Sequence, residues 1–138
     1  MRDEKLTALV ILATILSVGH TTDHMIRGDP QWPLTLKSVP FIAINLTIYS
    51  IIAFGLYFYS TNRIGPGFWV IVASAGVAFG WLAHFSRFTD QPPRYILGAY
   101  ESAAGGWLAL SCLIALMLVL MVAALYAGYL WTRRLRLR

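Results

Sequence analysis

The sequence contains few charged residues. Lys, Arg, Asp and Glu make up 12% of its 138 residues, whereas about 25% is typical of a soluble domain. Hydrophobic residues make up 58% of the chain. A chain of this composition has too little polar surface to face water on all sides. We therefore expect one integral membrane domain spanning the whole sequence.

Several motifs of known chemistry are also absent. The single cysteine, Cys112, has no second cysteine to pair with, which excludes an intramolecular disulfide and a zinc site of the Cys-x-x-Cys type. The sequence has no H-E-x-x-H motif, no glycine-rich phosphate loop and no Ser/His/Asp arrangement of recognisable spacing. It also has no internal repeat strong enough to suggest an inverted-repeat transporter. No acidic residue lies in mid-run, which argues against a proton-coupled exporter.

Long apolar runs are what the chain does contain. Four runs match or exceed the roughly 20 residues that cross the hydrocarbon core of a bilayer. They cover residues 6–26, 39–59, 67–87 and 102–131. Each break between them contains proline, glycine or both, and the runs are continuous rather than alternating in polarity. The sequence therefore predicts an all-α protein built as a four-transmembrane-helix bundle.

The basic residues at the ends of the runs predict an orientation. On one side lie Arg2, Lys5, Arg63, Arg133, Arg134, Arg136 and Arg138. On the other side lie only Arg27, Lys37, Arg87 and Arg94. We therefore expect both termini to be cytoplasmic, in the plasma membrane of a bacterium. The net charge of +5 is explained by this bias and by contact with anionic lipid head groups, so no nucleic-acid partner is expected.

Ionisable side chains gather near the end of the first run. Four of them recur at i, i+3, i+4 and i+7 of the expected helix: His20, Asp23, His24 and Arg27. This spacing puts them on one stripe of the helix. Because such groups are costly inside a membrane, a functional site is the default hypothesis. Asn45, at a similar depth on the second run, is expected to meet this stripe.

The third run carries small residues followed by a histidine. Gly76, Gly80 and His84 recur at i, i+4 and i+8, which is typical of a face where another helix packs closely. If the first helix packs there, His84 comes near His20 or His24. All three histidines of the chain would then meet at the outer membrane face.

A metal site is the first functional hypothesis. His20 and His24 form an i, i+4 pair that can bind one ion, with His84 or a carboxylate as third ligand. We expect a divalent metal such as zinc, copper or iron, acting on a lipid or another membrane-soluble substrate. The candidate general bases are Asp23, Asp90 and Glu101.

Two other classes of function remain open. A b-type haem would take His84 and either His20 or His24 as axial ligands, and its propionates would pair with Arg27, Arg87 or Arg94. A non-catalytic accessory subunit would use the same polar groups to hold a head group or a quinone. In that case the stripe is an internal hydrogen-bonded network. Four short helices bury little surface, so we expect a homo-oligomer or docking into a larger membrane complex.

Overall fold

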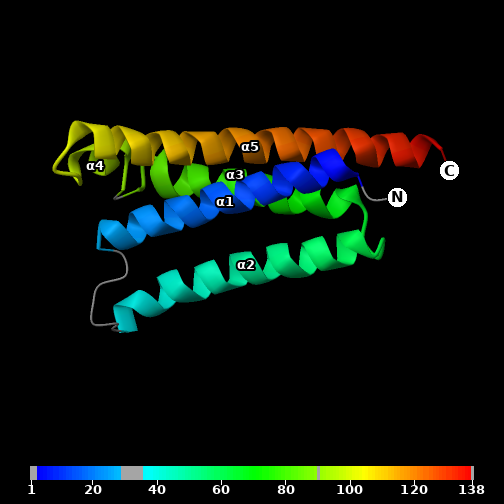
Figure 1. Cartoon of the computed structure of the whole chain (residues 1–138), viewed down its shortest axis with the longest axis horizontal. Coiled ribbons are helices and arrows are strands. Elements are labelled where there is room, and N and C mark those ends of the chain that lie inside the picture. The colour runs from blue at the N-terminus through cyan, green and yellow to red at the C-terminus, as the bar shows by residue number, and fades with distance from the viewer. Residues whose placement is uncertain (1–2, 29–35, 90, 138) are drawn as a thin grey trace.

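The computed structural model describes residues 3–28, 36–89 and 91–137, and every regular element in them is helical (Figure 1). The helices are α1 (Glu4–Ile26), α2 (Val39–Ser60), α3 (Pro66–His84), α4 (Pro93–Gly98) and α5 (Ala103–Arg136), and a 3-10 turn, η1 (Leu36–Ser38), precedes α2. The four longer helices are long and apolar enough to cross a membrane. The predicted all-α bundle is confirmed, and its composition indicates a membrane-embedded protein.

The long helix α5 organises the bundle (Figure 1). Helices α1 and α3 pack along it, and the short α4 packs against its first turns. Helix α1 begins and α5 ends at the same end of the bundle. The chain therefore crosses the bundle four times.

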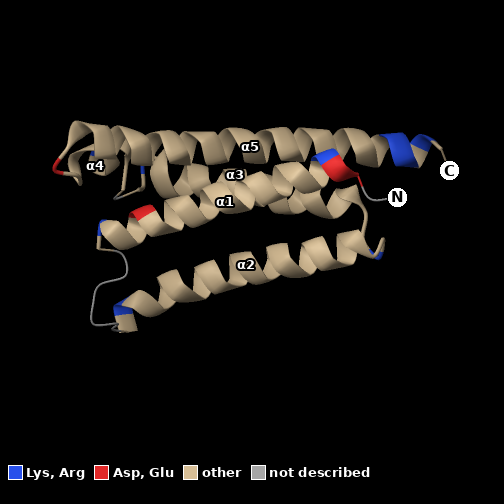
Figure 2. Ribbon diagram, in the orientation of Figure 1, with Lys and Arg blue, Asp and Glu red and all other residues tan. Residues whose placement is uncertain are grey.

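The end at which α5 finishes carries five of the nine described Lys and Arg residues, three of them at the end of α5, and we call it the basic end (Figure 2). Asp3 fixes the start of α1 there, because its Oδ1 accepts a hydrogen bond from the Leu6 N–H at 2.9 Å. Its backbone N–H donates to the Tyr59 hydroxyl of α2 at 3.2 Å, and its Oδ2 accepts from the Tyr126 hydroxyl of α5 at 3.3 Å. Three helices are thus joined at this end. We call the opposite end, which contains the histidines, the histidine end.

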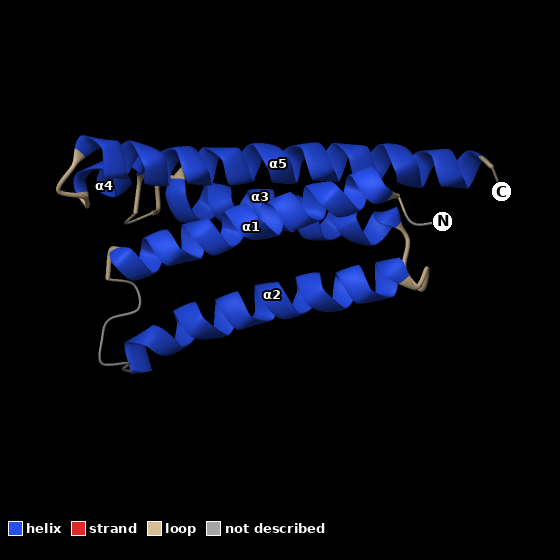
Figure 3. Cartoon of the chain, in the orientation of Figure 1, coloured by secondary structure: helices blue, strands red, loops and turns tan. Residues whose placement is uncertain are grey.

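One predicted helix boundary and one predicted loop are wrong at the histidine end. Helix α3 stops at His84 rather than at Arg87, and the short α4 lies in what was expected to be a loop (Figure 3). Side chains after α3 bond its last carbonyls, because the Ser86 hydroxyl donates to Leu82 O at 2.8 Å and the Thr89 hydroxyl donates to Ala83 O. These bonds turn the chain away from the helix axis.

The small-residue face of α3 packs on a different helix from the one expected. A Cβ added at Gly76 would lie 3.1 Å from Leu120 Cδ1, and one added at Gly80 would meet the sulfur of Met117. Both of those side chains belong to α5. The groove therefore holds α5 rather than α1.

Helix α2 packs against α3 near the basic end. There Gly55 lies against the rings of Phe68 and Trp69, so that even a Cβ would approach Phe68 to 2.5 Å. Beyond this contact, a cavity of about 930 Å³ lies between α2 and the other long helices, and all four line it. Hydrogen bonds through Thr21 connect α1 and α2 beside it. The three histidines line one end of this cavity.

Candidate metal centre

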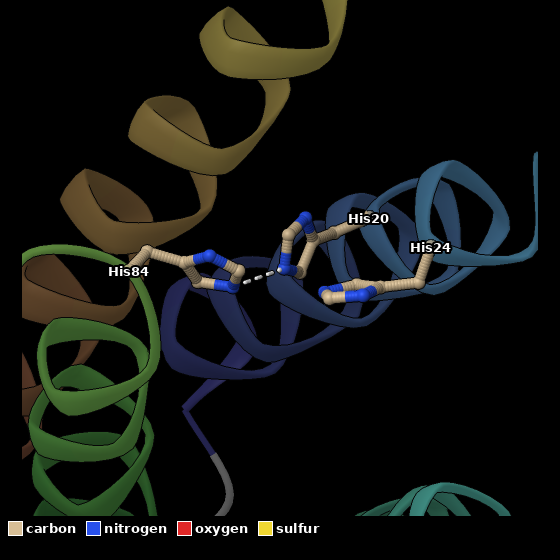
Figure 4. A group of neighbouring side chains, drawn as sticks. All are labelled: His20, His24 and His84. Atoms are coloured by element: carbon tan, nitrogen blue, oxygen red, sulfur yellow. Dashed lines mark hydrogen bonds between the residues drawn. The ribbon is translucent and has the colours of Figure 1, made fainter. Parts of the chain in front are cut away.

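The three histidines come from two helices. His20 and His24 lie one turn apart on α1, and His84 is the last residue of α3 (Figure 4). Their ring centroids are 4.7, 4.9 and 5.4 Å apart. One nitrogen from each ring lies within 4.8 Å of the others, which is close enough to hold one metal ion. The predicted convergence of the histidines is confirmed.

The spacing of two of the nitrogens is close to that of bound ligands. Nε2 of His20 and Nε2 of His84 are 3.1 Å apart. Two nitrogens that bind one tetrahedral zinc ion with bonds of 2.0–2.1 Å are separated by roughly 3.3 Å. His84 is buried, with 3% of its surface exposed. Small rotations of the rings would therefore be enough to admit an ion.

A backbone carbonyl determines which ring nitrogen of His84 carries the proton. Nδ1 of this ring lies 3.2 Å from the backbone oxygen of Gln91. Because a carbonyl can only accept, the neutral ring must carry its proton on Nδ1 and a lone pair on Nε2. The Nε2 that faces His20 is then the atom able to bind a metal. A hydrogen bond from the remote ring nitrogen is the usual support of a metal-binding histidine.

Asp23 lies next to His20, and its carboxylate accepts hydrogen bonds from two other side chains. Arg27 donates to it from Nε at 3.1 Å and from Nη2 at 2.7 Å, and the Tyr100 hydroxyl donates to Oδ1 at 2.6 Å. Its Oδ2 lies 3.8 Å from Nδ1 of His20. The side chains of Asp23 and Arg27 are 5% and 0% exposed. Asp23 is thus a buried partner of His20, and its oxygens already accept hydrogen bonds from Arg27 and Tyr100.

Two residues of this network were not predicted. Gln91 accepts from Nη1 of Arg27 at 3.1 Å through its side chain, while its backbone oxygen meets His84. Tyr100 follows α4, and burial together with the nearby Asp23 carboxylate raises the pKa of its phenol to about 12. The phenol therefore stays protonated and remains a donor. Neither residue type marks a site in a sequence; only Pro92 and Pro93 signalled a turn nearby.

Asn45 contacts α1 through Thr21, which is next to the predicted stripe rather than part of it. Its Oδ1 accepts from the Thr21 hydroxyl at 2.8 Å, and its Nδ2 donates to Phe41 O at 2.9 Å. The Tyr49 hydroxyl lies 2.9 Å from the same Thr21 hydroxyl. This polar bridge joins α1 to α2 beside the histidines.

The other predicted site residues lie away from the histidines or outside the described residues. Arg87 is exposed, with its guanidinium 4.9 Å from the centre of the Phe88 ring. Arg94 is exposed in α4, and Glu101 is exposed just before α5. Asp90 lies outside the described residues. A role for these four residues in catalysis or cofactor binding stays a prediction.

The geometry is less suited to a haem than to a single ion. A haem would have to enter between two axial imidazoles, whereas Nε2 of His20 and of His84 are 3.1 Å apart. The expected Gly76 and Gly80 groove is filled by Leu120 and Met117 of α5.

Comparisons with known protein families, curated proteins and solved structures found no match for this chain.

Proposed function

We propose that this protein binds one divalent metal ion through His20, His24 and His84. The observation that carries the proposal is the meeting of three imidazoles from two membrane helices, with ligand nitrogens within 4.8 Å of one another. Imidazole suits zinc, copper and iron, so the donor set alone does not select among them.

The hydrogen bonds around His20 support this proposal. Because Nε2 of His84 holds a lone pair, a neutral His20 must donate to it from its own Nε2. That leaves a second lone pair on Nδ1 of His20, facing the Asp23 carboxylate at 3.8 Å and without a hydrogen bond among the described residues. A metal ion on both Nε2 atoms would move the proton of His20 to Nδ1. The proton would then point at Asp23, as in carboxylate–histidine–zinc arrangements.

Three protein ligands leave a fourth coordination position, which is the pattern of catalytic rather than structural zinc sites. Here that position would face the cavity that the histidines line. A metal-bound water could there act on a lipid or another membrane-soluble substrate. Asp23 would orient His20 rather than serve as the general base, since Arg27 and Tyr100 already occupy its oxygens.

The proposal also includes the membrane in which the protein lies and its orientation there. We place the protein in the plasma membrane of a bacterium, with the histidine end on the outer face. The bias of seven basic residues against four towards the opposite end supports this orientation. Membrane lipid is the expected partner. The large apolar side chains exposed on all four long helices are compatible with a homo-oligomer or with a larger membrane complex.

Elemental analysis of protein purified after growth with added metal tests the proposal. We expect close to one equivalent of zinc, copper or iron and no Soret absorption. The single variants His20→Ala, His24→Ala and His84→Ala should each lose the metal. Thr22→Ala changes an exposed residue of the same helix and should keep it. Affinity should fall as pH is lowered, because protons compete with the metal for the imidazole nitrogens.

Other outcomes have clear meanings. Metal retained by His84→Ala but lost by His20→Ala would move the third ligand to a carboxylate. A Soret band would favour the haem alternative. Protein with neither metal nor haem after reconstitution would contradict both, and the histidines would then belong to the hydrogen-bonded network of an accessory or head-group-binding module.

A further inference from the structure

The cavity beside the histidines changes in polarity along its length. At the histidine end its wall includes His20, His24, His84 and Asn45. Towards the basic end the wall is apolar, and it includes Val10, Ile52, Trp69, Leu120 and Ala123. A molecule that fits this cavity therefore has a polar group at one end and a long apolar remainder.

The few hydroxyls along the middle of the cavity do not change this pattern. The Thr14 hydroxyl donates to Val10 O at 2.8 Å, and the Thr47 hydroxyl donates to Ala43 O at 2.8 Å. The hydroxyls of Thr14 and Thr47 are therefore satisfied by the backbone of their own helices. The Ser17 hydroxyl, which also lines the cavity, lies 3.5 Å from the Tyr49 hydroxyl. The middle of the cavity thus accepts an aliphatic chain, because these hydroxyls already have partners within the protein.

The length of the cavity sets the length of the chain. Val10 and His20 both line it and are separated by about 15 Å along α1, whereas Trp69 and His84 are separated by about 22 Å along α3. An extended chain advances roughly 1.2 Å per atom, since a residue of three backbone atoms spans at most 3.3–3.6 Å. The cavity therefore matches an extended chain of about 13 to 18 atoms.

The cavity is also open to the surroundings of the bundle. Three of its wall residues, Ile44, Ile51 and Phe79, are 42%, 43% and 50% exposed. They belong to helices that are long and apolar enough to span a membrane, so the opening faces the acyl chains of the bilayer. Acyl chains are thus the molecules that surround this opening.

We propose that the cavity binds one unbranched acyl chain of a membrane lipid, with its carbonyl group at the three histidines. The inference deepens the proposed function by naming its substrate class, and it rests on that function only for the metal at the head-group end. A volume of about 930 Å³ is within the range of about 300–1,000 Å³ usual for small-molecule pockets.

Trp69 allows the chain to be located, because it lines the far part of the cavity and is only 2% exposed. We would use zinc-loaded protein in detergent, with Trp69 as its single tryptophan and the others changed to phenylalanine. The probes are 16-bromohexadecanoic acid and 2-bromohexadecanoic acid, which carry the quenching bromine at opposite ends of the chain. The terminal bromine should quench Trp69 fluorescence saturably, and the bromine beside the carboxyl group should not.

Variants with a matched control assign this binding to the cavity. Ala75 and Ala78 are both exposed residues of α3, but only Ala75 lines the cavity. Ala75→Phe should weaken binding of the terminally brominated acid at least tenfold, whereas Ala78→Phe should leave it within twofold. The pair Ala43→Phe and Ala53→Phe repeats the comparison on α2, where only Ala43 lines the cavity.

The two proposals can fail separately. Equal quenching by both acids, or unchanged binding in both Ala75→Phe and Ala43→Phe, would contradict an acyl chain in the cavity whatever the metal content. Saturable quenching by the terminal bromine in protein that binds no metal would keep the chain and remove the metal centre. Zinc content should be unchanged in Ala75→Phe, because Ala75 lies about 13 Å along α3 from His84.

Discussion

The ion pair of Asp23 and Arg27 joins the chemistry of the histidines to the stability of the bundle. Both side chains are buried, and Asp23 also faces His20. We expect Asp23→Asn to destabilise the protein by about 3–5 kcal/mol, because it leaves a buried guanidinium without its anion. It should also weaken metal affinity by roughly 10- to 100-fold, as loss of a group that orients a ligand does.

Thermal unfolding in detergent and zinc titration measure these two effects. Glu101→Gln removes an exposed carboxylate near the same end and should change neither quantity. An Asp23→Asn protein with normal zinc affinity would mean that Asp23 supports only the fold.

Tyr100 provides a test that depends on pH. Burial and the Asp23 carboxylate raise the pKa of its phenol to about 12, whereas an ordinary tyrosine titrates near 10. The phenol is therefore a donor in folded protein up to high pH, and its stabilising contribution is complete below about 10 and is lost as pH rises through about 12. Ultraviolet titration should show a last phenol step that Tyr100→Phe removes.

Tyr57→Phe, which removes an exposed phenol elsewhere, should leave that last step in place. Tyr100→Phe should also cost about 1.5–3 kcal/mol of stability, as expected for a hydrogen bond to a charged group. A last step that persists in Tyr100→Phe would mean that another tyrosine carries the raised pKa.

Sequence spacing could predict only part of this site. The i, i+4 and i+7 positions on α1 were enough to place His20, His24 and Arg27 on one face. Tyr100 could not be found in this way, because it lies 77 positions from the Asp23 that it meets and reaches it only after α4 has packed on α5. Contacts that depend on the path of a loop leave no periodic pattern in the sequence.

At the scale of elements, the backbones of α4 and α5 approach each other closely at Gly106. A Cβ added at Gly106 of α5 would lie 2.6 Å from the backbone oxygen of Leu97 and 3.0 Å from its Cα. Gly106→Ala must therefore push α4 away, and we expect a loss of about 1–3 kcal/mol, as in other overpacked interiors. Thermal unfolding in detergent measures the loss.

Gly128 supplies the matched control on the same helix. A Cβ there meets nothing within 4 Å, so Gly128→Ala should be neutral or stabilise the helix by up to about 1 kcal/mol. Equal stability of the two alanine variants would show that α4 can shift at no cost. In that case α4 would not hold Tyr100 in place.

The sequence pattern predicted the long helices but not all of the contacts between them. The apolar runs predicted four long helices correctly, because length and composition suffice for that. Gly76 and Gly80 correctly marked a close contact but not the partner, since any helix with suitable side chains can fill such a groove. His84 reaches α1 nevertheless, since its Nε2 lies 3.1 Å from that of His20.

For the whole molecule, orientation is the property that most affects the interpretation. The described structure places the start of α1 and the end of α5 together, in agreement with the charge bias. We expect a reporter fused after Arg138 to be cytoplasmic and one inserted near Gln31 to be external. Enzymatic reporters that work on only one side of the membrane measure this. An external carboxyl terminus would place the histidines on the cytoplasmic face.

The lateral opening of the cavity also determines which concentration governs binding. A chain that enters through the exposed wall at Ile44 and Phe79 does not have to cross water. Its occupancy then depends on its mole fraction in the bilayer rather than on its molarity in the aqueous phase. The same total amount of ligand would saturate the protein in a small membrane volume and leave it empty in a large one. Apparent affinity should therefore scale with the amount of lipid or detergent in the sample, although no contact in the protein has changed.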